Sequence, residues 1–98
     1  MYGIRQNLYD EMIEVFKNAN VYRVYLFGSR ARGDFNATSD IDIAVEFLDN
    51  DKDNLIKLYT KLEELNTLYK FDIADMSMLD NSKFKKEIEK DRVEIYKK

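Results

Sequence analysis

The sequence predicts an α+β fold in two layers, with a small mixed β-sheet and helices packed on one face. Helix-like and strand-like segments follow one another in the order α-β-β-α-β-α, with a further short strand-like segment at the end. Two of the helical segments, each about 15 residues long, carry one apolar stripe and therefore need a sheet face to pack on. The 98 residues contain neither a repeat nor a linker, so we expect one domain, residues 1–98.

The first helix is predicted over residues 5–19, where apolar residues recur at intervals of three and four. The residues of this stripe are Ile4, Leu8, Met12, Val15, Phe16 and Ala19. A strand is predicted over residues 21–27, which are mostly β-branched or aromatic, and Gly28 ends it. The turn-forming residues of 28–39 predict a loop with one helical turn near Arg30.

The second strand is predicted over residues 40–47, because polar and apolar side chains alternate there. One face carries Asp40, Asp42, Ala44 and Glu46, and the core face carries Ile41, Ile43, Val45 and Phe47. With the helices on the core side, the face that carries the aspartates is predicted to stay open.

The second helix is predicted over residues 53–69. Its inner side consists of Leu55, Leu58, Tyr59, Leu62, Leu65 and Tyr69. A third strand is predicted over residues 70–76, and a weak capping sequence at residues 77–80 predicts the start of a third helix. The inward residues of that helix are Leu79, Phe84 and Ile88, and residues 93–96 predict a short edge strand.

Composition excludes several kinds of chemistry. Cys and His are both absent, which excludes disulfides, thiolate nucleophiles, Ser-His-Asp arrangements and most transition-metal sites. An enzyme of this composition must use carboxylates, hydroxyls, Lys or Arg, and hard metals. The net charge is -3 without a basic block, so affinity for nucleic acid is not indicated. No run approaches the ~20 apolar residues that span a membrane and no signal peptide is present, so we expect a cytoplasmic chain.

Asp40 and Asp42 project from one side of the predicted strand, roughly 6.5–7 Å apart at the backbone. Their carboxylates can converge on one divalent cation, or on two about 3.5–4 Å apart, although they could also be solvated charges on an exposed face. Asp72 favours a metal site, because three acids on one sheet face repel one another unless a cation binds among them. Asp75 lies on the opposite face of its strand from Asp72, and we favour Asp72 because both its neighbours are apolar.

Gly28 and Ser29 are candidates for binding phosphate. Glycine lets the backbone approach a ligand closely, and the following amides, with the Ser29 hydroxyl, can bind phosphate oxygens. An ordinary strand-ending turn would look the same, and neither a Walker sequence nor a dinucleotide fingerprint is present. Arg30 and Arg32 suit either a triphosphate or an acidic partner surface, and this choice is left open.

These residues together resemble the signature of the polymerase-β-type nucleotidyltransferase superfamily. The pattern is Gly28-Ser29, ten residues, Asp40-Ile-Asp42, and later an apolar-Asp72-apolar triplet. A chain this short is most similar to the minimal nucleotidyltransferases, the antitoxin halves of HEPN/MNT toxin–antitoxin pairs. The resemblance implies the nucleotidyltransferase fold and two Mg²⁺ ions held by Asp40 and Asp42. It also implies that Asp72 holds the ion that activates an acceptor hydroxyl, and that Gly28 and Ser29 position the triphosphate of ATP. From its place beside them, Arg30 is a further candidate for contact with the triphosphate.

The implied function is a protein adenylyltransferase that acts as an antitoxin. It would transfer a nucleoside monophosphate, AMP from ATP, to a tyrosine hydroxyl of a HEPN toxin encoded nearby. Two alternatives stay open, a non-catalytic module that occludes its partner and a nucleotidyltransferase with a small-molecule acceptor. The nucleotide, the acceptor, the number of nucleotides transferred and a homo- or hetero-oligomeric state also stay open.

Overall fold

The computed structural model describes residues 1–79 and 83–98. In chain order its elements are α1 (Gln6–Lys17), β1 (Val21–Phe27), α2 (Gly28–Arg32), β2 (Ile41–Phe47), α3 (Asn54–Glu63), β3 (Phe71–Asp75), the 3-10 turn η1 (Met76–Met78), α4 (Lys83–Asp91) and β4 (Val93–Lys97). The strands form one sheet in the order β3-β2-β1-β4. β1 is antiparallel to both β2 and β4, whereas β2 and β3 are parallel. The predicted α+β class with a mixed sheet is confirmed.

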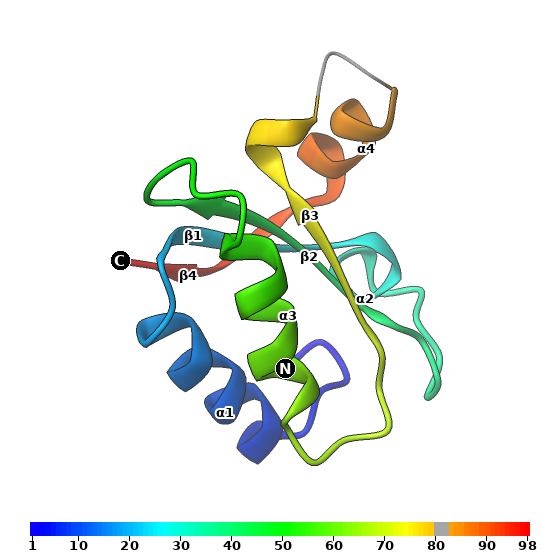
Figure 1. Ribbon diagram of the computed structural model, residues 1–98. Coiled ribbons are helices and arrows are strands. Elements are labelled where there is room, and N and C mark those ends of the chain that lie inside the picture. Colours follow the sequence, from blue (N-terminus) through cyan, green and yellow to red (C-terminus); the bar gives the residue numbers. More distant parts are fainter. Residues whose placement is uncertain (80–82) are drawn as a thin grey trace.

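One face of the sheet packs against α1 and α3, which lie together on that side in Figure 1. The predicted stripe of the first helix is confirmed, because Ile4, Leu8, Met12 and Phe16 are all buried. α3 is shorter than predicted, and Leu58 and Leu62, one helical turn apart, face the sheet. Tyr59 was predicted to face inward but is 41% exposed, since it lies one position around the helix from Leu58.

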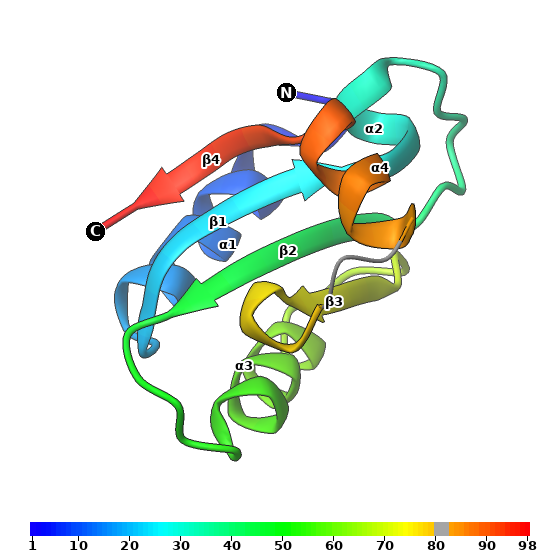
Figure 2. The same ribbon diagram turned by 90° about the horizontal axis from the view of Figure 1, so that it is seen from above.

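The opposite face of the sheet is less open than predicted, because α4 packs on part of it. Figure 2 shows α4 in front of the sheet, near the end of β1 and the start of β2. Ile88 of α4 is buried with Tyr25, Phe27 and Ala44 of the strands. The reason is that β1 is buried at four consecutive positions near its end, so both of its faces need cover. The predicted inward residue Phe84 remains 47% exposed.

Two further predictions concern the ends of elements. The capping sequence at residues 77–80 ends on Asp80, which lies outside the described residues. Asp75 instead accepts a hydrogen bond from the backbone N–H of Ser77 (2.9 Å) and caps η1. In the part of the chain that the structure describes, none of the helices has the length and apolar content needed to cross a membrane.

Candidate active site

Three of the predicted site residues meet where β1 ends. In the sheet register Asp42 of β2 lies opposite Phe27 of β1 on one side and opposite Asp72 of β3 on the other. Residues paired across neighbouring strands project to the same face, and such strands lie about 4.8 Å apart. Gly28 follows Phe27 directly. On the face of the sheet opposite α1 and α3, the order is therefore the Gly28 turn, Asp42 and Asp72.

Gly28 approaches Asp42 so closely that no side chain fits between them. Its φ is +74°, in the left-handed region that favours glycine. A Cβ at this position would collide with Oδ2 of Asp42 and lie 3.2 Å from its carboxyl carbon. The chain then forms the single helical turn α2, whose Ser29 carbonyl accepts hydrogen bonds from the N–H groups of Gly33 (2.9 Å) and Asp34 (3.1 Å). The predicted helical turn near Arg30 is confirmed.

The Asp42 carboxyl is held in an environment that disfavours its charge. Partial burial raises the pKa of Asp42 from 3.8 to about 6, and the negative charges of Asp72 and Asp40 act in the same direction. Arg30 and Arg32 oppose this shift of the pKa. Asp40 and Asp72 are exposed, so Asp42 is the most enclosed acid of the three. The predicted crowding of these three carboxylates is thus visible in the electrostatics of Asp42.

The raised pKa of Asp42 predicts a pH dependence of stability in the absence of divalent cations. Because the pKa of Asp42 is raised in the folded chain, the folded chain keeps a proton that the unfolded chain releases near pH 3.8. The resulting stabilisation is fully present below pH 3.8 and is lost as pH rises to about 6. We expect thermal melts in EDTA to show this loss in the wild type, and Asp42→Asn to lack it. Identical pH profiles for the two proteins would contradict the prediction.

The donor set suits a hard divalent cation. Carboxylate oxygens are the ligands that Mg²⁺ prefers, and a bound cation would favour the charged form of Asp42, which burial and then the charges of Asp72 and Asp40 disfavour. Among residues 1–79 and 83–98, no three acidic side chains as placed form a group that could hold a metal ion. Joint coordination by Asp40, Asp42 and Asp72 would therefore require their side chains to turn toward one point.

The structure places Arg30, the predicted triphosphate contact, in the interior of the fold. Its side chain is only 1% exposed, and its guanidinium is engaged within the fold. Nε and Nη2 donate to the Ser39 carbonyl (3.2 and 2.8 Å), and Nη1 donates to the Tyr2 carbonyl (3.0 Å). The guanidinium also lies 5.1 and 4.7 Å from the ring centroids of Phe35 and Tyr69. Arg30 thus connects Ser39, just before Asp40, with Tyr2 and Tyr69.

Arg32 lies on the surface and links α2 to α4. It forms ion pairs with Asp34 and Asp91, both at 3.2 Å. Between α2 and α4 lies a hollow of about 350 Å³ beside Gly28, which reasoning from the sequence missed. Its lining consists of Phe27, Gly28, Arg32, Phe84, Glu87, Ile88, Lys90 and Asp91. The edge-to-face contact of Phe27 with Phe84, at 6.0 Å between centroids, forms part of its wall.

Comparison with known proteins identifies the relatives of this chain. The family model described as "Polymerase beta, Nucleotidyltransferase" matches residues 10–98. A protein of Methanocaldococcus jannaschii, provisionally named a protein adenylyltransferase, is 35% identical over 77 residues, which cover 76% of this chain and 77% of that one.

Solved structures share the fold. The chain is similar to one in a crystal structure of a toxin–antitoxin with AMP-PNP, with a TM-score of 0.71, 23% identity and coverage of 92% of this chain and 73% of that chain. It is also similar to a chain in the complex of the tri-AMPylated Shewanella oneidensis HEPN toxin with MNT antitoxin, with a TM-score of 0.68 and 21% identity. That match covers 97% of this chain and 74% of the other.

Proposed function

The chain belongs to the polymerase-β-type nucleotidyltransferase family, and on this premise we propose that it transfers AMP from ATP to a hydroxyl group of a partner protein. The observation that carries the proposal is the position of Asp42, between the Gly28 turn on one side and Asp72 on the other. This order puts a backbone turn that can bind phosphate beside acids that can bind a cation.

Each residue of the site has a distinct part in the proposed reaction. Gly28 and Ser29 orient the triphosphate through backbone N–H groups and the Ser29 hydroxyl. Asp40 and Asp42 would hold two Mg²⁺ ions, and Asp72 would hold the one nearer the acceptor. Bound Mg²⁺ lowers the pKa of an attacking hydroxyl and stabilises the charge on the leaving group. The acceptor oxygen forms a bond to the α-phosphorus while its proton passes to solvent and the bond to pyrophosphate breaks, so AMP is transferred and pyrophosphate is released.

The partner that we propose is a HEPN toxin encoded nearby, with a tyrosine as acceptor. The name of the M. jannaschii relative supports a protein acceptor. The toxin–antitoxin complexes with the same fold suggest the class of partner, and one of them contains an AMPylated HEPN toxin. The chain would then act as an antitoxin in the cytoplasm by silencing its partner covalently.

A transfer assay with the purified HEPN protein tests this function. We expect label from α-labelled ATP, and none from γ-labelled ATP, to appear on the HEPN protein in the presence of Mg²⁺. EDTA should abolish the labelling, since the proposed reaction requires the metal. A complex of the two proteins that forms without any labelling would contradict catalysis and favour a module that only occludes its partner. Labelling of small molecules alone would contradict the proposed acceptor.

A further inference from the structure

The structure contains a groove between α3 and the edge strand β3 that reaches Asp72 of the site. Its volume is about 360 Å³, and its lining consists of Lys52, Leu55, Ile56, Tyr59, Phe71, Asp72 and Ile73. We call it the α3–β3 groove. Resting on the proposed function, we propose that the α3–β3 groove is the surface on which the acceptor protein docks.

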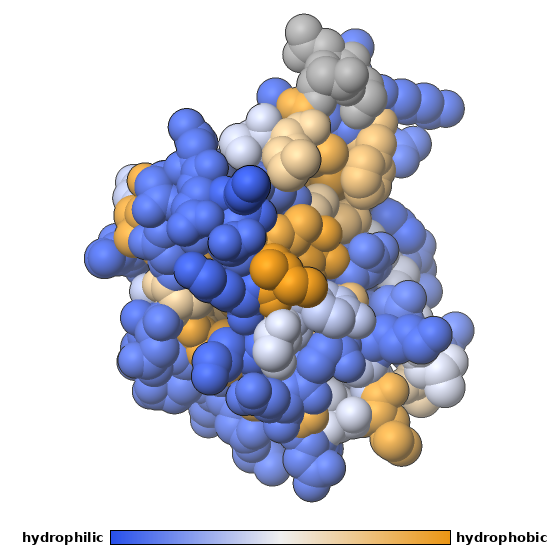
Figure 3. Space-filling model, viewed as in Figure 1, coloured by the Kyte–Doolittle hydropathy of each residue, from blue (hydrophilic) through white to orange (hydrophobic). Residues whose placement is uncertain are grey.

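The α3–β3 groove combines exposed apolar side chains with an open sheet edge. Ile56 is 59% exposed and Tyr59 is 41% exposed, and both side chains line this groove. Figure 3 shows the corresponding apolar patch in the middle of the molecule, between α3 and β3. β3 pairs with β2 alone among the strands that the structure describes, so its other edge is unpaired there. Together these features are typical of a surface that another protein covers.

The geometry of the reaction selects this side of the site for the acceptor. In an in-line displacement the attacking oxygen and the leaving group lie on opposite sides of the phosphorus. If the Gly28 turn holds the leaving pyrophosphate, the acceptor must approach from the opposite direction. The order across the sheet is the Gly28 turn, Asp42, Asp72 and then the free edge of β3. The α3–β3 groove lies at that edge and includes Asp72 in its lining.

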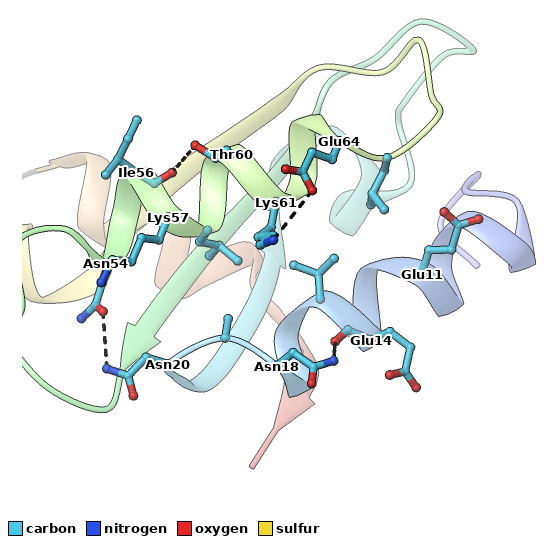
Figure 4. A pocket seen from close by; sticks show the side chains of 14 residues that line it. Glu11, Glu14, Asn18, Asn20, Asn54, Ile56, Lys57, Thr60, Lys61 and Glu64 are labelled. Atoms are coloured by element: carbon cyan, nitrogen blue, oxygen red, sulfur yellow. Dashed lines mark hydrogen bonds and ion pairs between the residues drawn. The ribbon is translucent and has the colours of Figure 1, made fainter.

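A larger groove on the molecule does not meet this requirement. It has a volume of about 870 Å³ and lies between α1 and α3, where Figure 4 shows side chains of the two helices on either side of it. Unlike the α3–β3 groove, it includes none of Gly28, Asp42 and Asp72 in its lining. Its polar end contains Asn20 and Asn54, 3.4 Å apart, next to the end of β2 that is remote from Asp42. This groove therefore does not place its occupant beside Asp72.

The chemistry of the α3–β3 groove defines its occupant. The lining is apolar except for Lys52 and Asp72, so it fits a protein segment with an apolar side chain near the residue that carries the acceptor hydroxyl. The volume is at the lower end of the range of about 300–1,000 Å³ found for small-molecule sites, and a small-molecule acceptor is therefore an outcome that the test must separate.

Removal of the Tyr59 ring tests the proposed docking surface and leaves Asp40, Asp42 and Asp72 unchanged. Tyr59→Ser is the sharper variant, because Ile56 also lines the groove between α1 and α3. We expect Tyr59→Ser, alone and combined with Ile56→Ser, to raise the KM for the HEPN protein about tenfold or more. The Kd for Mg-ATP, measured by calorimetry, should stay within about twofold of the wild-type value, because neither residue lies beside the Gly28 turn. Leu48→Ser is the matched control, since Leu48 is 44% exposed and lies outside the groove lining.

The outcomes separate this inference from the proposed function. An unchanged KM for the HEPN protein, or an equal loss in Leu48→Ser, would overturn the docking surface and leave the transferase function standing. A parallel loss of Mg-ATP affinity would also overturn it, because the groove would then belong to the nucleotide. If the wild type transfers no label, the proposed function fails. The docking surface is then tested only by the affinity of this chain for the HEPN protein. A tenfold weaker complex with Tyr59→Ser would then support the docking surface, and an unchanged affinity would overturn it.

Discussion

Asp42→Asn is expected to lower nucleotidyl transfer by a factor on the order of 10³ or more while the protein stays folded. Asp42 is the acid that borders both the Gly28 turn and Asp72, so no other side chain of the site can replace its carboxylate. The amide of Asn is almost isosteric but carries no charge and binds a divalent cation weakly. The measurement is the transfer of label from α-labelled ATP at saturating Mg²⁺, with folding checked by thermal melts.

Stability should change in the opposite direction from activity. The raised pKa of Asp42 means that its charged form is disfavoured by the fold, so Asn should leave the melting temperature in EDTA at pH 7 unchanged or higher. Millimolar Mg²⁺ should stabilise the wild type by binding and should have a smaller effect on the variant. Asp75→Asn is the matched control, because this acid caps η1 and lies on the other face of β3. Undiminished transfer by Asp42→Asn would remove the basis of the mechanism.

Gly28→Ala is expected to damage both the fold and the site. The added methyl group would sit at a φ of +74° and would collide with the carboxylate of Asp42. The backbone strain alone costs about 1–2 kcal/mol in the free energy of unfolding, and displacement of the carboxylate adds to it. The loss of transfer activity should exceed what the fraction of unfolded protein explains, because the displaced group is the central acid of the proposed site. Denaturant unfolding and the α-label assay measure the two effects separately.

Gly33→Ala provides the comparison that separates strain from collision. Gly33 has a φ of +95°, but a Cβ there would have no atom within 4 Å. This variant should therefore lose a similar amount of stability through backbone strain, and it should keep its transfer activity. If both variants lost transfer to the same extent, the close approach of Gly28 to Asp42 would not be the cause.

The parts of the fold that could be predicted depend on patterns within a single segment. The spacing of Leu8, Met12 and Phe16 reports the buried side of α1, because a helix repeats every 3.6 residues. The alternation around Ile41 and Asp42 likewise reports the two faces of β2. The same reasoning brought Asp72 to the site, and the register confirms that it lies beside Asp42.

The parts that could not be predicted depend on which segments meet. α4 packs over Tyr25 and Phe27. To predict this packing one must know where α4 meets the sheet, which the pattern within one segment does not tell. One signal was present in the sequence, the consecutive apolar residues at the end of β1, which indicate a strand buried on both faces. Arg30 carried no such signal. Its position beside Gly28 and Ser29 suggested a ligand, whereas its partners come from three other parts of the chain.

The burial of Arg30 has a consequence for how the molecule opens. One guanidinium joins the carbonyl of Tyr2 near the N-terminus, the carbonyl of Ser39 just before Asp40, and the ring of Tyr69 on the way into β3. Fraying of the first residues would leave a buried cation short of an acceptor, which destabilises the loop that carries Asp40. We therefore expect opening of the segment at Tyr2 and loosening of the loop before Asp40 to be coupled, so that the amide protons of the two segments exchange with solvent together.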